Sequence, residues 1–419
     1  MIDKIKDYVN NIESITSEKE AIKAELNVAR TIQQDMLPKN FDKINIRKDI
    51  NISAINIPEA EVGGDFYNYI LLNNKLYLII ADVSGSGIPA ALFMARANYL
   101  INSAIKLSNS PKVILSYVNS ELSKSNEENY FVTISIYYID LNTRKVISAN
   151  AGHENPIIIK KNNEVVMFKE KKNAPIATKA GLIYEENEFE LEEGDALFLY
   201  TDGVVEAIND KEELYGEPRL LEVLKDTSDL KSDDIIEKVK TSVSNFSNVP
   251  DQYDDITMLC FKFEDLHINY DASKVHRYNK AFDANYDSIE DINKFVEEEI
   301  LKFYKDDEKV VEYFNKIEVC TEEIVVNIID HAYKGIIIDD LKKIYVEIEI
   351  DLNINKISIT YIDNGPEFNP INKDNPNILK SAKDREIGGL GIFITKQVVD
   401  DIEYEYVNNQ NKLKINKFV

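Results

Sequence analysis

Four short acidic motifs, each beside an apolar run, constrain the first two thirds of this chain more than any other feature. They are Gly63-Gly64-Asp65, Ala81-Asp82-Val83-Ser84-Gly85, Tyr200-Thr201-Asp202-Gly203 and Asp254-Asp255-Ile256-Thr257. A single Asp-Gly step usually marks a turn. Carboxylates that converge from several strand ends instead form an oxygen-only site suited to Mg²⁺ or Mn²⁺, and two such ions activate a water and neutralise a phosphate.

Short strands and long helices surround these motifs. Segments rich in Ile, Val, Tyr and Phe predict strands at 50–56, 76–81, 130–139, 144–149, 155–160, 195–200 and 255–263. Apolar residues that return every three or four positions predict helices at 88–107, 111–124 and 232–245. Strands in pairs with helices between them favour an α+β layered sandwich.

In their order and spacing, the motifs resemble the PPM-type (type 2C) metal-dependent protein phosphatases, specifically the branch typified by the stage II sporulation protein E phosphatase. The resemblance runs from about Ala24 to Phe263 and includes Ala29–Pro38, Val62–Tyr67, Asn150–His153 and Tyr215-Gly216. It implies an αββα sandwich with serine/threonine protein phosphatase activity and two Mn²⁺ or Mg²⁺ ions.

The same resemblance implies the metal ligands, which are Asp65, Asp82, Asp202 and Asp254, assisted by the carbonyl of Val83. Asp254 is preferred over Asp255 because the family's ligand is the first residue of that motif. Ser86 departs from the bulkier His or Lys of many relatives, at a position that is not a ligand. A histidine in a tight turn, such as His153, is more often structural than a general acid.

Residues 1–37 contain no Gly or Pro, and a heptad pattern runs through them. The pattern selects Ile5, Tyr8, Ile12, Ile15, Lys19, Ile22, Leu26, Ala29, Gln33 and Met36, of which eight of ten are apolar. Such a seam predicts a coiled coil and a homodimer. The alternative is a lone helix packed on its own domain. Pro38 ends the helix in either case.

A polar segment at 264–275 lies between the first domain and a second α+β unit. We therefore divide the chain into a helix at 1–37, a phosphatase domain at 38–264 and a further domain at 265–419. In this last domain we expect helices at 287–304, 309–332 and 390–400, and strands at 343–351, 355–362 and 402–418.

The further domain lacks a P-loop, so a nucleotide site there must be of another kind. Glu323 and Asn327 are four residues apart on a predicted helix and share one face. Asp363-Asn364-Gly365 follows a strand, and Gly388-Gly389-Leu390-Gly391 opens a helix, where backbone amides suit phosphate.

Together these motifs resemble the GHKL ATPase fold, a two-layer α/β sandwich, and most of all the anti-sigma-factor serine kinases, over residues 276–419. The resemblance implies that Glu323 activates an acceptor hydroxyl, that Asn327 binds the Mg²⁺ of ATP, and that Asp363 binds the adenine amino group. Gly365, Gly389 and Gly391 would shape the pocket. The loop from Pro366 to Ile387 would be the ATP lid, where Arg385 either contacts phosphate or is an ordinary surface residue.

Charge and composition limit the kinds of molecule that can bind this chain. With 49 Lys and Arg against 74 Asp and Glu, the net charge of −25 excludes nucleic acid as a direct partner. No apolar stretch reaches the length of a membrane span, and the isolated Cys260 and Cys320 indicate a reducing cytoplasm. The resemblances imply as substrate a phosphorylated anti-sigma-factor antagonist of the STAS type. They leave open whether the further domain phosphorylates that class of partner or only sequesters a sigma factor or antagonist.

Overall fold

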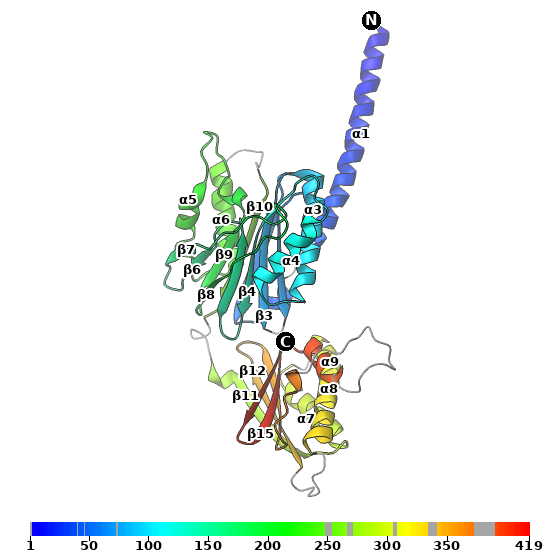
Figure 1. Cartoon of the computed structure of the whole chain (residues 1–419), viewed down its shortest axis with the longest axis vertical. Helices are drawn as coiled ribbons and strands as arrows, with labels where there is room; N and C mark the ends of the chain where they lie inside the picture. The colour runs from blue at the N-terminus through cyan, green and yellow to red at the C-terminus, as the bar shows by residue number, and fades with distance from the viewer. Residues whose placement is uncertain are drawn as a thin grey trace. The chain divides into compact units, whose positions relative to one another are not determined.

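The computed structural model describes residues 2–39, 41–45, 47–72, 74–247, 254–265, 271–304, 308–333, 342–372 and 390–419. It divides into two compact units (Figure 1). The first comprises Met1–Asn45, Ile50–Leu71 and Lys75–Glu264, and the second comprises Ile46–Asp49, Leu72–Asn74 and Asp265–Val419. Among the helices of the described residues, none is both long and apolar enough to cross a membrane.

The chain begins with one long helix, α1 (Ile2–Asp35), as the heptad pattern predicts. Every side chain from 15 to 25 is exposed, including the seam residues Ile15 and Ile22. Over this stretch the helix is therefore not packed on its own domain. Just beyond the end of the helix the chain is anchored, because Leu37 is buried and the Tyr67 hydroxyl donates to the Pro38 carbonyl at 2.9 Å.

Two five-stranded sheets form the centre of the first unit. One has the order β1 (Ile50–Ile57), β10 (Ile256–Phe263), β9 (Ala196–Tyr200), β6 (Ile157–Ile159) and β7 (Val165–Met167). The other has the order β2 (Phe66–Leu72), β3 (Lys75–Val83), β4 (Val132–Asp140), β5 (Lys145–Ala151) and β8 (Asn187–Glu190). The central strands are largely buried on both faces, which is why β3 and β9 contain continuous apolar runs rather than alternating ones.

Helices cover both outer faces of this pair of sheets. Helices α3 (Gly87–Ile105) and α4 (Pro111–Ser123) pack on β3, β4 and β5, while α6 (Ser232–Ser247) packs on β1 and β10 and against α5 (Gly216–Val223). In α3 the buried residues include Ala90, Phe93, Met94, Ala97 and Ile101, the spacing of one helical face. The predicted αββα sandwich is confirmed. A short helix, α2 (Asp42–Asn45), precedes β1.

The second unit contains one antiparallel sheet with the order β11 (Val275–Asp283), β12 (Lys343–Asp351), β13 (Lys356–Asp363), β15 (Gln410–Phe418) and β14 (Asp401–Val407). Helices α7 (Ser288–Leu301), α8 (Glu308–Asn327) and α9 (Leu390–Val398) form the other layer. In β12, Ile344, Val346, Ile348 and Ile350 are buried, as expected for a strand with one face toward the core.

Several sequence predictions about individual elements were wrong. The single strand expected at 402–418 is the hairpin of β14 and β15, because Asn408 and Asn409 adopt positive φ angles of 54° and 61° and make the turn without glycine. Strand β11 begins where only a linker was expected. Strands β2, β7 and β8 and helix α5 were missed, and β7 and β8 are edge strands of three and four residues.

Candidate functional site

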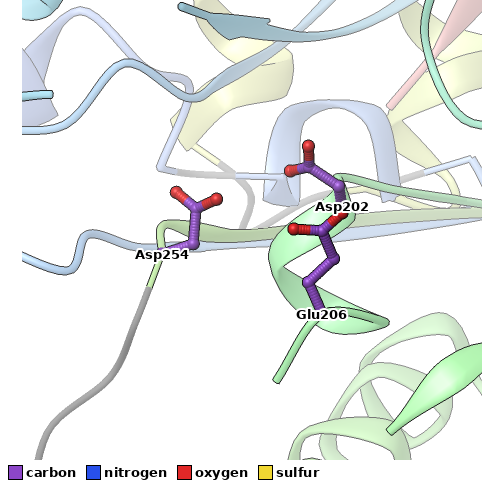
Figure 2. Close-up of side chains that lie close together, drawn as sticks. All are labelled: Asp202, Glu206 and Asp254. Carbon is purple, nitrogen blue, oxygen red and sulfur yellow. The ribbon is translucent and has the colours of Figure 1, made fainter. Parts of the chain in front are cut away.

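The four acidic motifs meet at one end of the two facing sheets. Asp65 precedes β2 and Asp82 lies at the end of the neighbouring β3, while Asp202 follows β9 and Asp254 precedes the antiparallel β10. Carboxylate oxygens of Asp202, Asp254 and Glu206 all lie within 4.8 Å of one another, and Figure 2 shows these side chains close together.

Like charges and burial raise the pKa values of these carboxyl groups. Burial, followed by Asp202 and Asp254, raises the pKa of Asp82 to about 7. Burial and then the Asp202 charge raise the pKa of Asp254 to about 6, although the hydrogen bond that its carboxylate accepts from the Asp255 N–H acts in the opposite direction. The pKa of Asp65 is raised well above its usual range by burial and then by Asp82. A divalent cation would offset this repulsion, so the residues present fit a hard metal ion.

Thr201 connects the Asp65 and Asp254 motifs. Its hydroxyl donates to Asp65 Oδ2 at 2.7 Å and accepts from the Thr257 N–H at 3.0 Å. The Val83 carbonyl lies close to Gly64, where an added β-carbon would come within 2.7 Å of the carbonyl oxygen. Glycine is therefore needed for the backbone to approach this predicted ligand.

Asp254 and Asp255 have different surroundings. The buried Asp255 carboxylate accepts hydrogen bonds from the backbone N–H groups of Glu59 (2.7 Å), Gly64 (2.7 Å) and Asp65 (3.3 Å). Asp254 is exposed and belongs to the acidic cluster that it forms with Asp202 and Glu206. Asp255 thus holds the loop that carries Asp65, whereas the Asp254 carboxylate accepts from the Asp255 N–H at 2.8 Å and lies within 4.8 Å of the carboxylates of Asp202 and Glu206.

Glu206 belongs to this cluster and was missed by the sequence analysis. It follows Asp202 by four residues and lies just beyond a short 3₁₀ helix, Asp202–Val204. An i, i+4 spacing of two acids after a strand was the signal that could have found it.

His153 is buried, and its Nδ1 lies 3.0 Å from Thr133 Oγ1. Burial is the main cause that lowers its pKa to about 3, so the ring is neutral near pH 7. Asn150 holds the backbone of His153 on both sides, accepting from its N–H at 2.8 Å and donating to its carbonyl at 3.1 Å. These contacts fit a structural histidine.

The end of α1 also contacts the site. The Gln33 side chain donates to the Gly63 carbonyl at 2.6 Å and accepts from the Gly63 N–H at 3.2 Å. Both hydrogen bonds fall on the loop that carries Asp65. The heptad pattern placed this glutamine in the predicted coiled-coil seam, whereas its side chain holds the loop beside the site.

The second unit has a pocket of about 400 Å³, counting the space open to solvent. Of the predicted site residues, Asn327 and Asp363 both line it. The wall also includes residues that the sequence analysis missed, among them Phe368, Tyr404 and Asn411. Tyr404 and Asn411 lie on the β14–β15 hairpin, where the sequence pattern predicts a single strand.

Glu323 lies against the start of α9, where a β-carbon on Gly391 would collide with its carboxylate. Gly365 packs against Ala332 with no room for a side chain. Gly389, Arg385 and most of the predicted lid lie outside the described residues. After Asn327, helix α8 continues as a π-helix over Ile328–Ala332, so the predicted helix 309–332 changes its winding beside the pocket.

Comparisons with known proteins agree with these two units. Residues 73–264 match the family of stage II sporulation protein E (SpoIIE), and residues 282–417 match the histidine kinase-like ATPase domain. The chain is 28% identical over 185 residues to phosphoserine phosphatase RsbU of Bacillus subtilis, covering 44% of this chain and 54% of that protein. It is 26% identical over 285 residues to protein IcfG of Synechocystis, and this match covers 61% of this chain and 42% of IcfG.

This chain therefore spans about half the length of those relatives. The solved SiaA-PP2C domain of Pseudomonas aeruginosa shares the fold, with a TM-score of 0.54 at 23% identity over 59% of this chain and 99% of that one. The two family matches and the layered fold lead to one conclusion: the chain combines a SpoIIE-type PPM phosphatase domain with a C-terminal histidine kinase-like ATPase domain.

Proposed function

We propose that this chain is a metal-dependent protein phosphatase that hydrolyses phosphoserine or phosphothreonine. The convergence of carboxylates from four separate motifs supports this most strongly: Asp202 and Asp254 lie close together, Asp82 interacts with both, and Asp65 interacts with Asp82. Asp65, Asp82, Asp202 and Asp254, with the Val83 carbonyl, would hold two Mn²⁺ or Mg²⁺ ions, and Glu206 would be a further ligand. Bound ions of this kind supply an activated water and neutralise the charge of the phosphate.

The remaining residues of the site position these ligands. Asp255 and Thr201 hold the Asp65 loop through hydrogen bonds to its backbone and to its carboxylate. Because burial and like charges disfavour ionisation of the grouped carboxyl groups, the metal-free site favours partial protonation, and a bound cation would favour full ionisation.

The substrate that we propose is a phosphorylated anti-sigma-factor antagonist of the STAS type in the cytoplasm. The similarity to a protein named phosphoserine phosphatase supports the chemistry, and the motif resemblance supports the partner. A sigma factor is a second candidate partner, through the C-terminal domain.

For that domain we propose ATP binding with Mg²⁺, in the pocket lined by Asn327 and Asp363. Glu323 would then act as the base in a serine kinase. The competing function is a binding module that sequesters a sigma factor or an antagonist without transferring phosphate.

One experiment tests the leading function. The purified chain is incubated with a phosphorylated STAS antagonist, with Mn²⁺, Mg²⁺ or EDTA, and with or without ATP, and phosphate release is measured. We expect release with either metal and none in EDTA. Release that is equal in EDTA would contradict the metal-dependent mechanism, and ATP-driven rephosphorylation would favour the kinase over the binding module.

A further inference from the structure

Asn411 is a buried hydrogen-bonding residue in the wall of the second unit's pocket. Its Nδ2 donates to Asp363 Oδ1 at 2.9 Å, to the Pro366 carbonyl at 3.0 Å and to the Gly365 carbonyl at 3.3 Å. All three acceptors belong to the end of β13 and the turn that follows it.

The oxygen of the same amide accepts two hydrogen bonds. The Tyr404 hydroxyl donates to Asn411 Oδ1 at 2.6 Å, and the Phe368 N–H donates to it at 3.0 Å. All five contacts require one orientation of the amide, because the opposite orientation would place its oxygen against a carboxylate and two carbonyls. The amino group of Asn411 is therefore fixed on Asp363.

Asp363 Oδ1 also accepts from the Gly365 N–H at 2.8 Å. Within the described part of the chain no hydrogen bond reaches Oδ2, and Asp363 lines the pocket. We infer that Asn411, oriented by Tyr404, is a positioning residue that makes this pocket select a purine with an amino group at ring position 6 over one with an oxo group. The inference rests on the nucleotide binding proposed above.

The chemistry of the two oxygens explains the selection. With Oδ1 engaged by two donors, Oδ2 is left as an acceptor for a donor on the ligand, which the 6-amino group supplies. A 6-oxo group would set two acceptors against each other and leave both unpaired in a buried site. Without the Asn411 amide, the carboxyl group of Asp363 can turn or carry a proton, and a proton would let it donate to the oxo group.

The test is calorimetric titration of the full chain with ATP, inosine triphosphate and purine riboside triphosphate, which lacks any group at position 6. We expect the parent chain to bind ATP on the order of 100-fold more tightly than inosine triphosphate. In Asn411→Leu this ratio should fall about tenfold, whereas affinity for purine riboside triphosphate should stay within about twofold. Tyr404→Phe should shift the ratio about threefold in the same direction.

Asn416→Leu is the matched control. Asn416 is also a buried asparagine of β15, accepts from the Ser358 hydroxyl at 2.7 Å, and is not part of the pocket wall. Its substitution should leave the ratio unchanged. If Asn411→Leu keeps the parent's ratio of ATP affinity to inosine triphosphate affinity, the inference is overturned. If that variant does not fold, an unchanged ratio in Tyr404→Phe overturns it instead. A parent chain that binds no nucleotide would instead refute the nucleotide site itself.

Discussion

At the residue scale, the carboxylates of the acidic site are of two kinds: those that raise one another's pKa values, and Asp255, which holds the backbone. Asp82 and Asp202 belong to the first kind, since the charge of Asp202 is among the causes that raise the Asp82 pKa. His153 belongs to neither, because it is buried and neutral.

Replacing Asp82 or Asp202 by Ala is expected to lower phosphatase turnover by on the order of 1,000-fold, because each change removes a charge from the metal site. His153→Ala should retain most of the activity in a chain that still folds. Turnover is measured at saturating Mn²⁺ with folding checked by circular dichroism. An active Asp82→Ala protein would contradict the ligand assignment.

Asp255→Asn is expected to act on metal affinity rather than on turnover. In the parent chain both carboxylate oxygens of Asp255 accept hydrogen bonds from backbone N–H groups. An asparagine amide has only one acceptor oxygen, so the loop that carries Asp65 would lose support. The Mn²⁺ concentration for half-maximal activity should rise about tenfold, with kcat at saturating Mn²⁺ nearly unchanged.

Asp254→Ala is the comparison for that test, because it should lower kcat even at saturating Mn²⁺. Titrating activity against Mn²⁺ separates the two. If Asp255→Asn lowers kcat and Asp254→Ala shifts only the metal dependence, their roles are reversed.

The acidic cluster also predicts how stability depends on pH. The pKa of Asp82 is about 7 in the folded chain against an ordinary 3.8, so the metal-free folded state binds more protons than the unfolded state between these values. Stability is therefore lost as pH rises through this range.

In EDTA, Tm should fall from pH 5 to pH 8, and Asp82→Asn should reduce this fall. A parent Tm that rises with pH relative to Asp82→Asn would contradict the assignment. Mn²⁺ should raise Tm most at pH 8.

At the scale of elements, α1 combines an exposed apolar seam with an anchored end. Ile15 and Ile22 are exposed, whereas Gln33 binds Gly63 beside the Asp65 loop. A second copy of the helix could cover the exposed part of the seam around Ile15 and Ile22, while Gln33, a seam position nearer the end of α1, keeps its contact with Gly63.

We therefore expect the full chain to be a dimer at micromolar concentration and a chain beginning at residue 38 to be a monomer, as measured by light scattering. The double variant Ile15→Glu/Ile22→Glu should also be monomeric, because charges would enter the seam. Ser17→Glu/Ala24→Glu, outside the seam, should leave the dimer intact. Equal masses for the full and shortened chains would rule out this mode of association.

At the scale of the whole molecule, the proposed function gives the two units separate chemistries with separate metal requirements. Asn327→Ala is expected to weaken ATP binding about tenfold, since it would remove an oxygen ligand from the bound Mg²⁺. Glu323→Gln should preserve binding and block phosphate transfer. Calorimetry and a kinase assay on the full chain distinguish these effects. Equal ATP affinity in the parent and Asn327→Ala would contradict this role of Asn327.

Local patterns in the sequence determined a layered α+β sandwich, a second α+β unit and the motifs of both, because buried central strands and acidic turns are readable without a structure, while the αββα arrangement followed from the family resemblance. The sequence could not identify the contacts that only packing creates. Glu206 beside Asp202 and Asp254 depends on how a turn after β9 meets the start of β10.

The same limit explains the other residues that were missed. Asn411 and Tyr404 reach Asp363 only because Asn408 and Asn409 turn the last segment back into a hairpin, and no heptad or alternation records that turn. Asp254 and Asp255 are neighbours with the same chemistry, and tertiary structure decides which one accepts hydrogen bonds from Gly64 and Asp65. Local propensity is a property of a few consecutive residues, whereas a site depends on the distances between segments that lie far apart in the chain.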